Sequence, residues 1–132
     1  MKLIFVNGCF DVIHRGHIEL FKYSRSLGDS LVVAIDSDER VKMMKGYERP
    51  FNNQDDRKFL LESIRYIDDV QIFNNETELE NLTFKYKPYI MVVGSDWKGK
   101  NIVGSQHAKQ IKFFERIGKY STTNILQNSF DR

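Results

Sequence analysis

The sequence predicts an α/β protein: a single three-layer, doubly wound domain with a five-stranded, mostly parallel sheet. Five short apolar runs, most of them rich in β-branched or aromatic residues, alternate with longer segments that carry apolar residues at helical spacing. No hairpin signal separates consecutive runs, so we expect right-handed crossovers and parallel strands that are covered on both faces. The 132 residues suit one domain, expected to span 1–132, with a substantial hydrophobic core.

The expected elements alternate along the chain. Strands are predicted at five runs, Lys2–Val6, Ser30–Ile35, Asp69–Phe73, Tyr89–Val93 and Ile111–Glu115. Helices are predicted between them, at His17–Leu27, Asp55–Tyr66 and Glu76–Tyr86. The stretch Lys45–Gln54 contains Pro50 and has no periodic pattern, so we expect a loop there, over the carboxyl edge of the sheet.

Charge and composition disfavour several classes of protein. Twenty basic and 18 acidic side chains give a net charge of +2, which is too small to favour nucleic acid or an anionic membrane as the main partner. The single cysteine, Cys9, excludes an internal disulfide, and the apolar run Leu3–Val6 is too short for a signal peptide or a membrane span. We therefore expect a cytoplasmic enzyme or binding module.

The first strand leads into NGCFDVIHRGHIEL, Asn7–Leu20, at the strand-to-helix turn where doubly wound sheets commonly bind phosphate. This stretch lacks the Gly-x-Gly-x-x-Gly fingerprint of dinucleotide-binding proteins. If the helix begins near His17, its first N–H groups and the positive end of its dipole face the turn, with His14 and His17 as further donors. Gly16 lets a ligand approach the backbone closely. The pattern indicates a site for a large anion.

Two other interpretations of the histidines remain open. Cys9, His14 and His17 fall within nine residues and are metal-ligand types. However, Cys9 precedes the helix by a whole loop and no fourth thiol or imidazole lies near in sequence, so we expect no metal site. The histidines are also compatible with ordinary polar residues of a loop.

Two motifs resemble those of a known family. GCFDVIHRGH, Gly8–His17, resembles the G-x-F-D…H-x-G-H signature of the cytidylyltransferase-like nucleotidyltransferases, and YSTT, Tyr120–Thr123, resembles their second signature. Lys45–Arg57 and Gly94–Gly104 are similar to segments of the heptose-1-phosphate adenylyltransferases. The stretches RKFLLESIRYIDDV, Arg57–Val70, and SDWKGK, Ser95–Lys100, and the overall size also resemble the glycerol-3-phosphate cytidylyltransferases.

This resemblance implies a Rossmann-like nucleotidyltransferase fold and a reaction in which an acceptor phosphate attacks the α-phosphorus of ATP or CTP and pyrophosphate leaves. Such a reaction needs no protein nucleophile, so catalysis consists of positioning and of neutralising phosphate charge. By the family pattern His14 and His17 contact the triphosphate, and Lys45 is the mobile cation that reaches the α-phosphate and the acceptor. The alternative for Lys45 is an ordinary solvated lysine. Mg²⁺ is expected to arrive with the nucleotide.

The resemblance also implies a set of nucleotide-binding residues. Arg57 is either a bidentate phosphate ligand or a solvated side chain, and Trp97 is either a wall of the base pocket or a packed aromatic. Asp11 is expected to orient its neighbours or the acceptor rather than to act as a base. The Ser-Thr-Thr run at a second helix N-terminus would complete the phosphate clamp. The expected set is Gly8, Cys9, Phe10, Asp11, Gly16, Arg57, Gly94, Asp96, Trp97, Arg116, Tyr120, Ser121, Thr122 and Thr123.

The sequence leaves the acceptor open. Arg116 favours the cytidylyltransferase branch, whereas Tyr120 and the loop KGYERPFN favour the heptose branch. The best interpretation is an enzyme of the heptose-1-phosphate adenylyltransferase type, acting on a phosphorylated sugar. A glycerol-3-phosphate cytidylyltransferase, acting on a phosphorylated polyol, is the alternative, and a nucleotide-binding regulatory module is the non-enzymatic one. A homodimer is expected from the family alone.

Overall fold

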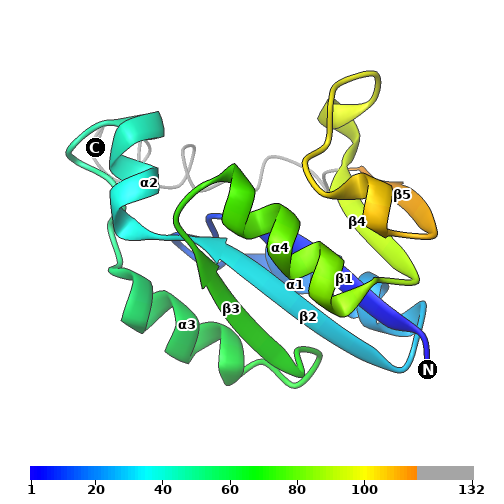
Figure 1. The fold of residues 1–132 in the computed structure, drawn as a ribbon. Coiled ribbons are helices and arrows are strands. Elements are labelled where there is room, and N and C mark those ends of the chain that lie inside the picture. Colours follow the sequence, from blue (N-terminus) through cyan, green and yellow to red (C-terminus); the bar gives the residue numbers. More distant parts are fainter. Residues whose placement is uncertain (116–132) are drawn as a thin grey trace.

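The computed structural model describes residues 1–115 (Figure 1). Within this range the strands are β1 (Leu3–Gly8), β2 (Ser30–Asp36), β3 (Asp69–Phe73), β4 (Ile90–Gly94) and β5 (Gln110–Phe114). The helices are α1 (Arg15–Ser26), α2 (Asp38–Lys45), α3 (Gln54–Glu62), α4 (Glu76–Tyr86) and the short 3₁₀ helices η1 (Ser95–Trp97) and η2 (Ser105–His107). The domain expected over 1–132 includes residues 116–132, which lie outside the described part.

The described strands form one sheet of order β3-β2-β1-β4-β5, and each neighbouring pair is parallel. This arrangement confirms the predicted doubly wound α/β fold. From β1 at the centre the chain moves outward to β2 and β3, then crosses to β4 and β5 on the other side. The switch point therefore lies between β1 and β4, and sheets of this kind bind ligands there, outside the carboxyl ends of the strands.

Helices cover both faces of the sheet, because successive residues of a strand point to opposite faces. Ile4 and Val6 of β1 pack in the core with α1 and α3, whereas Phe5 packs on the other face with α4. Figure 1 shows α4 in front of the sheet and α1 behind it. The three side chains are each at most 2% exposed, which explains why this strand reads as an unbroken apolar run.

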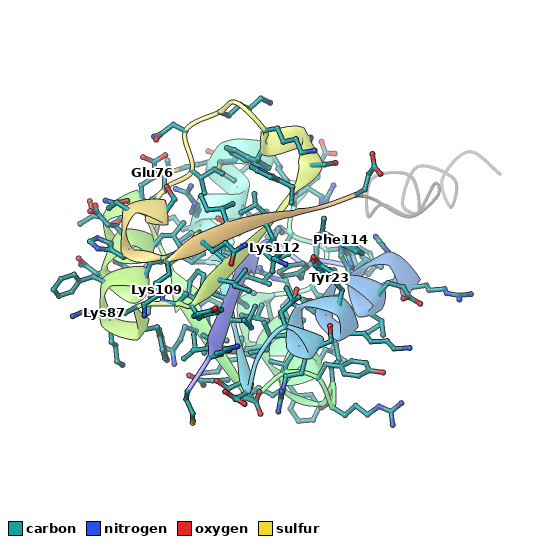
Figure 2. All side chains as sticks on the ribbon, turned by 90° about the vertical axis from the view of Figure 1, so that its right-hand side faces the viewer. Tyr23, Glu76, Lys87, Lys109, Lys112 and Phe114 are labelled. Carbon is teal, nitrogen blue, oxygen red and sulfur yellow. The ribbon has the colours of Figure 1, made fainter. Side chains whose placement is uncertain are left out.

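One edge of the sheet, β5, packs against α1 through an aromatic pair. The rings of Tyr23 and Phe114 are stacked with their centroids 5.3 Å apart, and Figure 2 shows the two side chains together between α1 and β5. The connection from β4 to β5 contains η1 and η2 instead of an α-helix. At Gly104, before η2, the backbone has φ +82° and a Cβ would overlap Thr83 Oγ1 of α4, so glycine is required there.

The structure differs from the predicted elements mainly at α2, which the sequence pattern did not indicate. Ser37 caps this helix by accepting a hydrogen bond from the backbone N–H of Arg40 at 3.2 Å. The helix buries only Val41, so it has no apolar period to recognise. Elsewhere α1 begins two residues before the predicted start, and α3 ends at Glu62 rather than at Tyr66. The predicted loop is confirmed between α2 and α3.

Candidate active site

The first turn of α1 is capped by two imidazole rings. His14 is the N-cap residue, and its Nδ1 accepts a hydrogen bond from the backbone N–H of Gly16 at 3.1 Å. In return, Nδ1 of His17 accepts from the backbone N–H of His14 at 3.3 Å. The two rings are stacked, with centroids 3.7 Å apart. This is a reciprocal capping box, a motif usually built from a hydroxyl and a carboxylate or amide.

The capping bonds determine where each neutral imidazole carries its proton. Because Nδ1 of His14 and Nδ1 of His17 both accept, the proton of each neutral ring is on Nε2. Each ring is therefore fixed in orientation through one nitrogen and is a hydrogen-bond donor through the other. These two donors are added to the positive end of the α1 dipole. The arrangement suits the binding of a polyphosphate.

Phe10 packs against His17. Its ring packs edge-on against His17 at 5.2 Å and against Phe21 at 5.0 Å, and the residue is 7% exposed with a positive φ of 51°. A Cβ at Gly8 would lie 3.0 Å from the Phe10 ring, so Gly8 leaves room for this ring. Gly8 and Phe10 thus support the ring of His17, and their contact with the nucleotide stays a prediction.

Asp11 holds the loop between α2 and α3 against the turn after β1. Its Oδ2 accepts from Arg49 Nε at 3.1 Å and from the backbone N–H of Phe51 at 2.7 Å, and its Oδ1 accepts from the backbone N–H of Asn52 at 2.8 Å. The residue is 1% exposed. Asp11 therefore orients its neighbours, which is one of the two roles expected for it from the sequence.

Arg57 is buried among backbone carbonyl groups and does not face solvent. Its side chain is 0% exposed, Nε donates to the carbonyl oxygen of Asn52, and Nη1 donates to those of Cys9 and Asp36. Nη2 pairs with Asp38 Oδ1 at 2.8 Å. The structure corrects the alternative of a solvated side chain, whereas the binding of phosphate by Arg57 stays a prediction. Arg57 joins the segments after β1 and β2 to the start of α3.

Lys45 is the last residue of α2, and its side chain is exposed. It lies near enough to the turn after β1 that its charge acts on the Cys9 thiol. Burial raises the pKa of Cys9, and the nearby positive charges of Lys45 and Arg57 offset only part of this increase. Cys9 is therefore a neutral thiol at pH 7, and Lys45 is an exposed cation within electrostatic range of the turn after β1.

The loop after β4 forms the other side of the switch point. Gly94 ends β4, and a Cβ there would lie 2.7 Å from Asp96 Oδ1, so Asp96 folds back over the end of the strand. Trp97 is 47% exposed and has the ammonium group of Lys100 above its ring, 5.8 Å from the centroid. Trp97 is thus available to a ligand and is not a core aromatic.

The structure therefore brings most of the expected site residues to two neighbouring turns. Those near the end of β1 are Gly8, Cys9, Phe10, Asp11, His14, Gly16, His17, Lys45 and Arg57, and those after β4 are Gly94, Asp96 and Trp97. The remaining five, Arg116, Tyr120, Ser121, Thr122 and Thr123, lie outside the described residues, as does the second helix expected after them.

Sequence reasoning assigned no role to Arg49 or Asn52. Both lie in the KGYERPFN loop, whose resemblance to the heptose branch was the available signal. Their partner Asp11 is 38 and 41 residues away, respectively, and such pairing leaves no trace in local spacing. Over residues 1–115 there is no cluster of three or more His, Cys, Asp or Glu side chains able to hold a metal ion, and no helix long and apolar enough to cross a membrane.

The five-stranded parallel sheet and the His-x-Gly-His turn after its central strand define a Rossmann-like nucleotidyltransferase fold. Comparison with family models agrees, since residues 5–128 match the model described as cytidylyltransferase-like. The chain belongs to the cytidylyltransferase-like family.

Individual relatives are also recognisable. The chain is 44% identical over 130 residues to the bifunctional protein HldE of Campylobacter concisus, a match that covers 98% of this chain and 27% of that protein. It is 40% identical over 126 residues to bifunctional protein HldE of Helicobacter pylori strain J99, covering 96% and 27%. The chain thus spans about a quarter of the length of these curated relatives. The crystal structure of the lipopolysaccharide core biosynthesis protein from Thermoplasma volcanium superimposes with a TM-score of 0.67 at 25% identity, covering 92% of this chain and 99% of that one.

Proposed function

We propose that the chain transfers AMP from ATP to a heptose 1-phosphate and releases pyrophosphate. The observation that carries this proposal is the pair of imidazoles that caps α1 at the switch point of the sheet. It provides fixed Nε2–H donors at a helix N-terminus, where a triphosphate is best stabilised.

The comparisons support the choice of acceptor. The HldE relatives are bifunctional, and this chain matches 27% of their length, so we infer that it corresponds to one of their two functions. The similar protein from Thermoplasma volcanium is named for lipopolysaccharide core biosynthesis. The segment Lys45–Arg57 supports the same acceptor, because it resembles the corresponding segment of the heptose-1-phosphate adenylyltransferases.

In the proposed mechanism the residues of this chain position charge and do not form a covalent intermediate. Nε2–H groups of His14 and His17 donate to the triphosphate and stabilise the charge that develops on the leaving pyrophosphate. The ammonium group of Lys45 neutralises the α-phosphate and the incoming acceptor oxygen. No general base is required, because a phosphate dianion already lacks the proton. Asp11 is unsuited to that role in any case, since its carboxylate accepts three hydrogen bonds.

Magnesium enters this proposal with the nucleotide. No metal-binding cluster exists among residues 1–115, and the buried carboxylate of Asp11 is already hydrogen-bonded. Mg²⁺ is typically held by phosphate oxygens and water with few protein ligands, so MgATP as the substrate is compatible with this site. We further propose a cytoplasmic homodimer that binds neither nucleic acid nor membrane.

A matrix of ATP or CTP against heptose 1-phosphate or glycerol 3-phosphate, read out as pyrophosphate release with Mg²⁺ present, tests the proposal. We expect release with ATP and heptose 1-phosphate. Release only with CTP and glycerol 3-phosphate would assign the chain to the other branch. Tight nucleotide binding without release for any acceptor would indicate a regulatory module.

A further inference from the structure

Arg49 lies in the loop between α2 and α3, beside the turn that follows β1. Its side chain is 16% exposed, and Nε donates to Asp11 Oδ2 at 3.1 Å. Asp11 is itself buried and also receives the backbone N–H groups of Phe51 and Asn52. The guanidinium group of Arg49 is therefore held in place by a carboxylate that is fixed by the same loop.

Arg49 has donor capacity that the described residues do not use. Its Nη2 atom is buried, and no residue within 1–115 accepts a hydrogen bond from it. Arg57 nearby differs, because Nε, Nη1 and Nη2 of that side chain all donate to protein oxygens. A buried charged donor without an acceptor is costly, and it calls for an explanation such as a bound anion.

The position of Arg49 indicates which anion could accept a hydrogen bond from Nη2. The α2–α3 loop follows β2, and β2 and β4 flank β1 on opposite sides of the sheet order. In an in-line displacement the acceptor oxygen and the leaving pyrophosphate lie on opposite sides of the α-phosphorus. If the nucleotide occupies the switch point between β1 and β4, as proposed above, the β2 side, where the α2–α3 loop carries Arg49, is left for the acceptor.

We propose that Arg49 binds the phosphate group of the acceptor through Nη2, and that Asp11 is the positioning residue that holds the guanidinium group for this contact. The inference rests on the proposed nucleotidyl transfer and adds the group by which the second substrate is recognised, a phosphomonoester dianion. A planar guanidinium group that Asp11 fixes through Nε holds Nη2 in one orientation, whereas a lysine ammonium on its flexible chain is not held in this way.

Calorimetry on the full chain tests this assignment without requiring turnover. The protein is first saturated with α,β-methylene-ATP, an analogue that cannot release pyrophosphate, and is then titrated with heptose 1-phosphate or with glycerol 3-phosphate. The variants are Arg49→Gln and Arg49→Lys, with Arg65→Lys as the control, because Arg65 is an exposed arginine between α3 and β3. Thermal melting of each variant is recorded beside the titrations.

We expect Arg49→Gln to raise the Kd of the acceptor at least about 10-fold and the Kd of the analogue less than about twofold, the effect of losing one charge-assisted hydrogen bond to the acceptor alone. Arg49→Lys is expected to lie between Arg49→Gln and the parent, and Arg65→Lys to match the parent. If Arg49→Gln does not fold, Arg49→Lys decides by the same comparison.

Equal weakening of analogue and acceptor would place Arg49 at the nucleotide and overturn the proposal. Unchanged affinities in a variant that melts like the parent would leave only a structural role and also overturn it, as would a parent chain that binds neither acceptor. The chain could also release no pyrophosphate with ATP or CTP and still bind the acceptor in a way that depends on Arg49. That result would sustain the Arg49 assignment and refute the proposed reaction.

Discussion

Replacing His14 by asparagine separates the two roles that the structure gives this imidazole. As the N-cap of α1, Nδ1 of His14 accepts from the backbone N–H of Gly16 at 3.1 Å. Asparagine is among the best N-cap residues, and its side-chain oxygen replaces Nδ1 as the acceptor, whereas it has no donor at the position of Nε2. Alanine at the same position removes both functions, so His14→Ala is the matched comparison.

The expected magnitudes follow from these contacts. Loss of a cap costs about 1 kcal/mol, which lowers the melting temperature of a domain of this size by about 4 °C. Loss of one donor to developing phosphate charge costs about 10²-fold in kcat, or about 2.7 kcal/mol. We therefore expect His14→Asn to melt like the parent and to be about 10²-fold slower. His14→Ala is expected to show both losses.

The assay combines pyrophosphate release from ATP and heptose 1-phosphate with a thermal melt of each variant. Full activity in His14→Asn would refute the assignment of Nε2 to the triphosphate. A melting temperature of His14→Ala equal to that of the parent would refute the capping role of the imidazole.

Three further outcomes are expected. Lys45→Ala is expected to lower kcat/KM about 10²-fold and to leave the melting temperature unchanged, because Lys45 is exposed. The control Lys42→Ala, in the same helix, is expected to change neither quantity. Equal effects of the two substitutions would refute the catalytic role of Lys45. Burial, together with the hydrogen bond to the Asp69 carboxylate at 2.7 Å, raises the pKa of Tyr86 to about 12. The folded state thus holds this proton more tightly than the unfolded state, so its contribution to stability is complete below pH about 10 and is lost between about 10 and 12. An alkaline absorbance titration detects a late tyrosine that is missing in Tyr86→Phe, and its persistence in that variant would contradict the assignment. Burial also raises the pKa of Cys9. Iodoacetamide at pH 8 is therefore expected to react at least about 10-fold more slowly with Cys9 than with free cysteine. A rate equal to that of free cysteine would show an accessible thiolate and contradict this expectation.

The sequence was sufficient to predict those helices and strands whose apolar residues recur regularly. The helix at Glu76–Tyr86 and the strand at Asp69–Phe73 have the bounds predicted for them. Asn75, whose side chain accepts from the backbone N–H of Glu78 at 2.9 Å, marks the start of that helix. In contrast, α2 buries a single residue, so its existence depends on local capping and on contacts with the α3 segment that periodicity does not reveal.

The candidate site could be located from the sequence, although the roles of several of its residues could not. The His-x-Gly-His spacing and the position of the first strand were enough to predict that the two histidines lie at the start of a helix, at the carboxyl end of the first strand. The role of Arg57 was not predictable, because its four acceptors lie in three separate segments that only the tertiary structure brings together. For Asp11 the orienting role was expected from the sequence, whereas its partners in the α2–α3 loop were not, because they lie 38 to 41 residues away.

The central claim is that the imidazole-capped start of α1 holds the triphosphate, and a crystal structure of the chain with α,β-methylene-ATP and Mg²⁺ tests it most directly. We expect phosphate oxygens within about 3.2 Å of Nε2 of both His14 and His17, the range of a hydrogen bond, with the base beside the loop that follows β4. A nucleotide bound elsewhere, or one whose phosphates lie away from both rings, would contradict this account of the site.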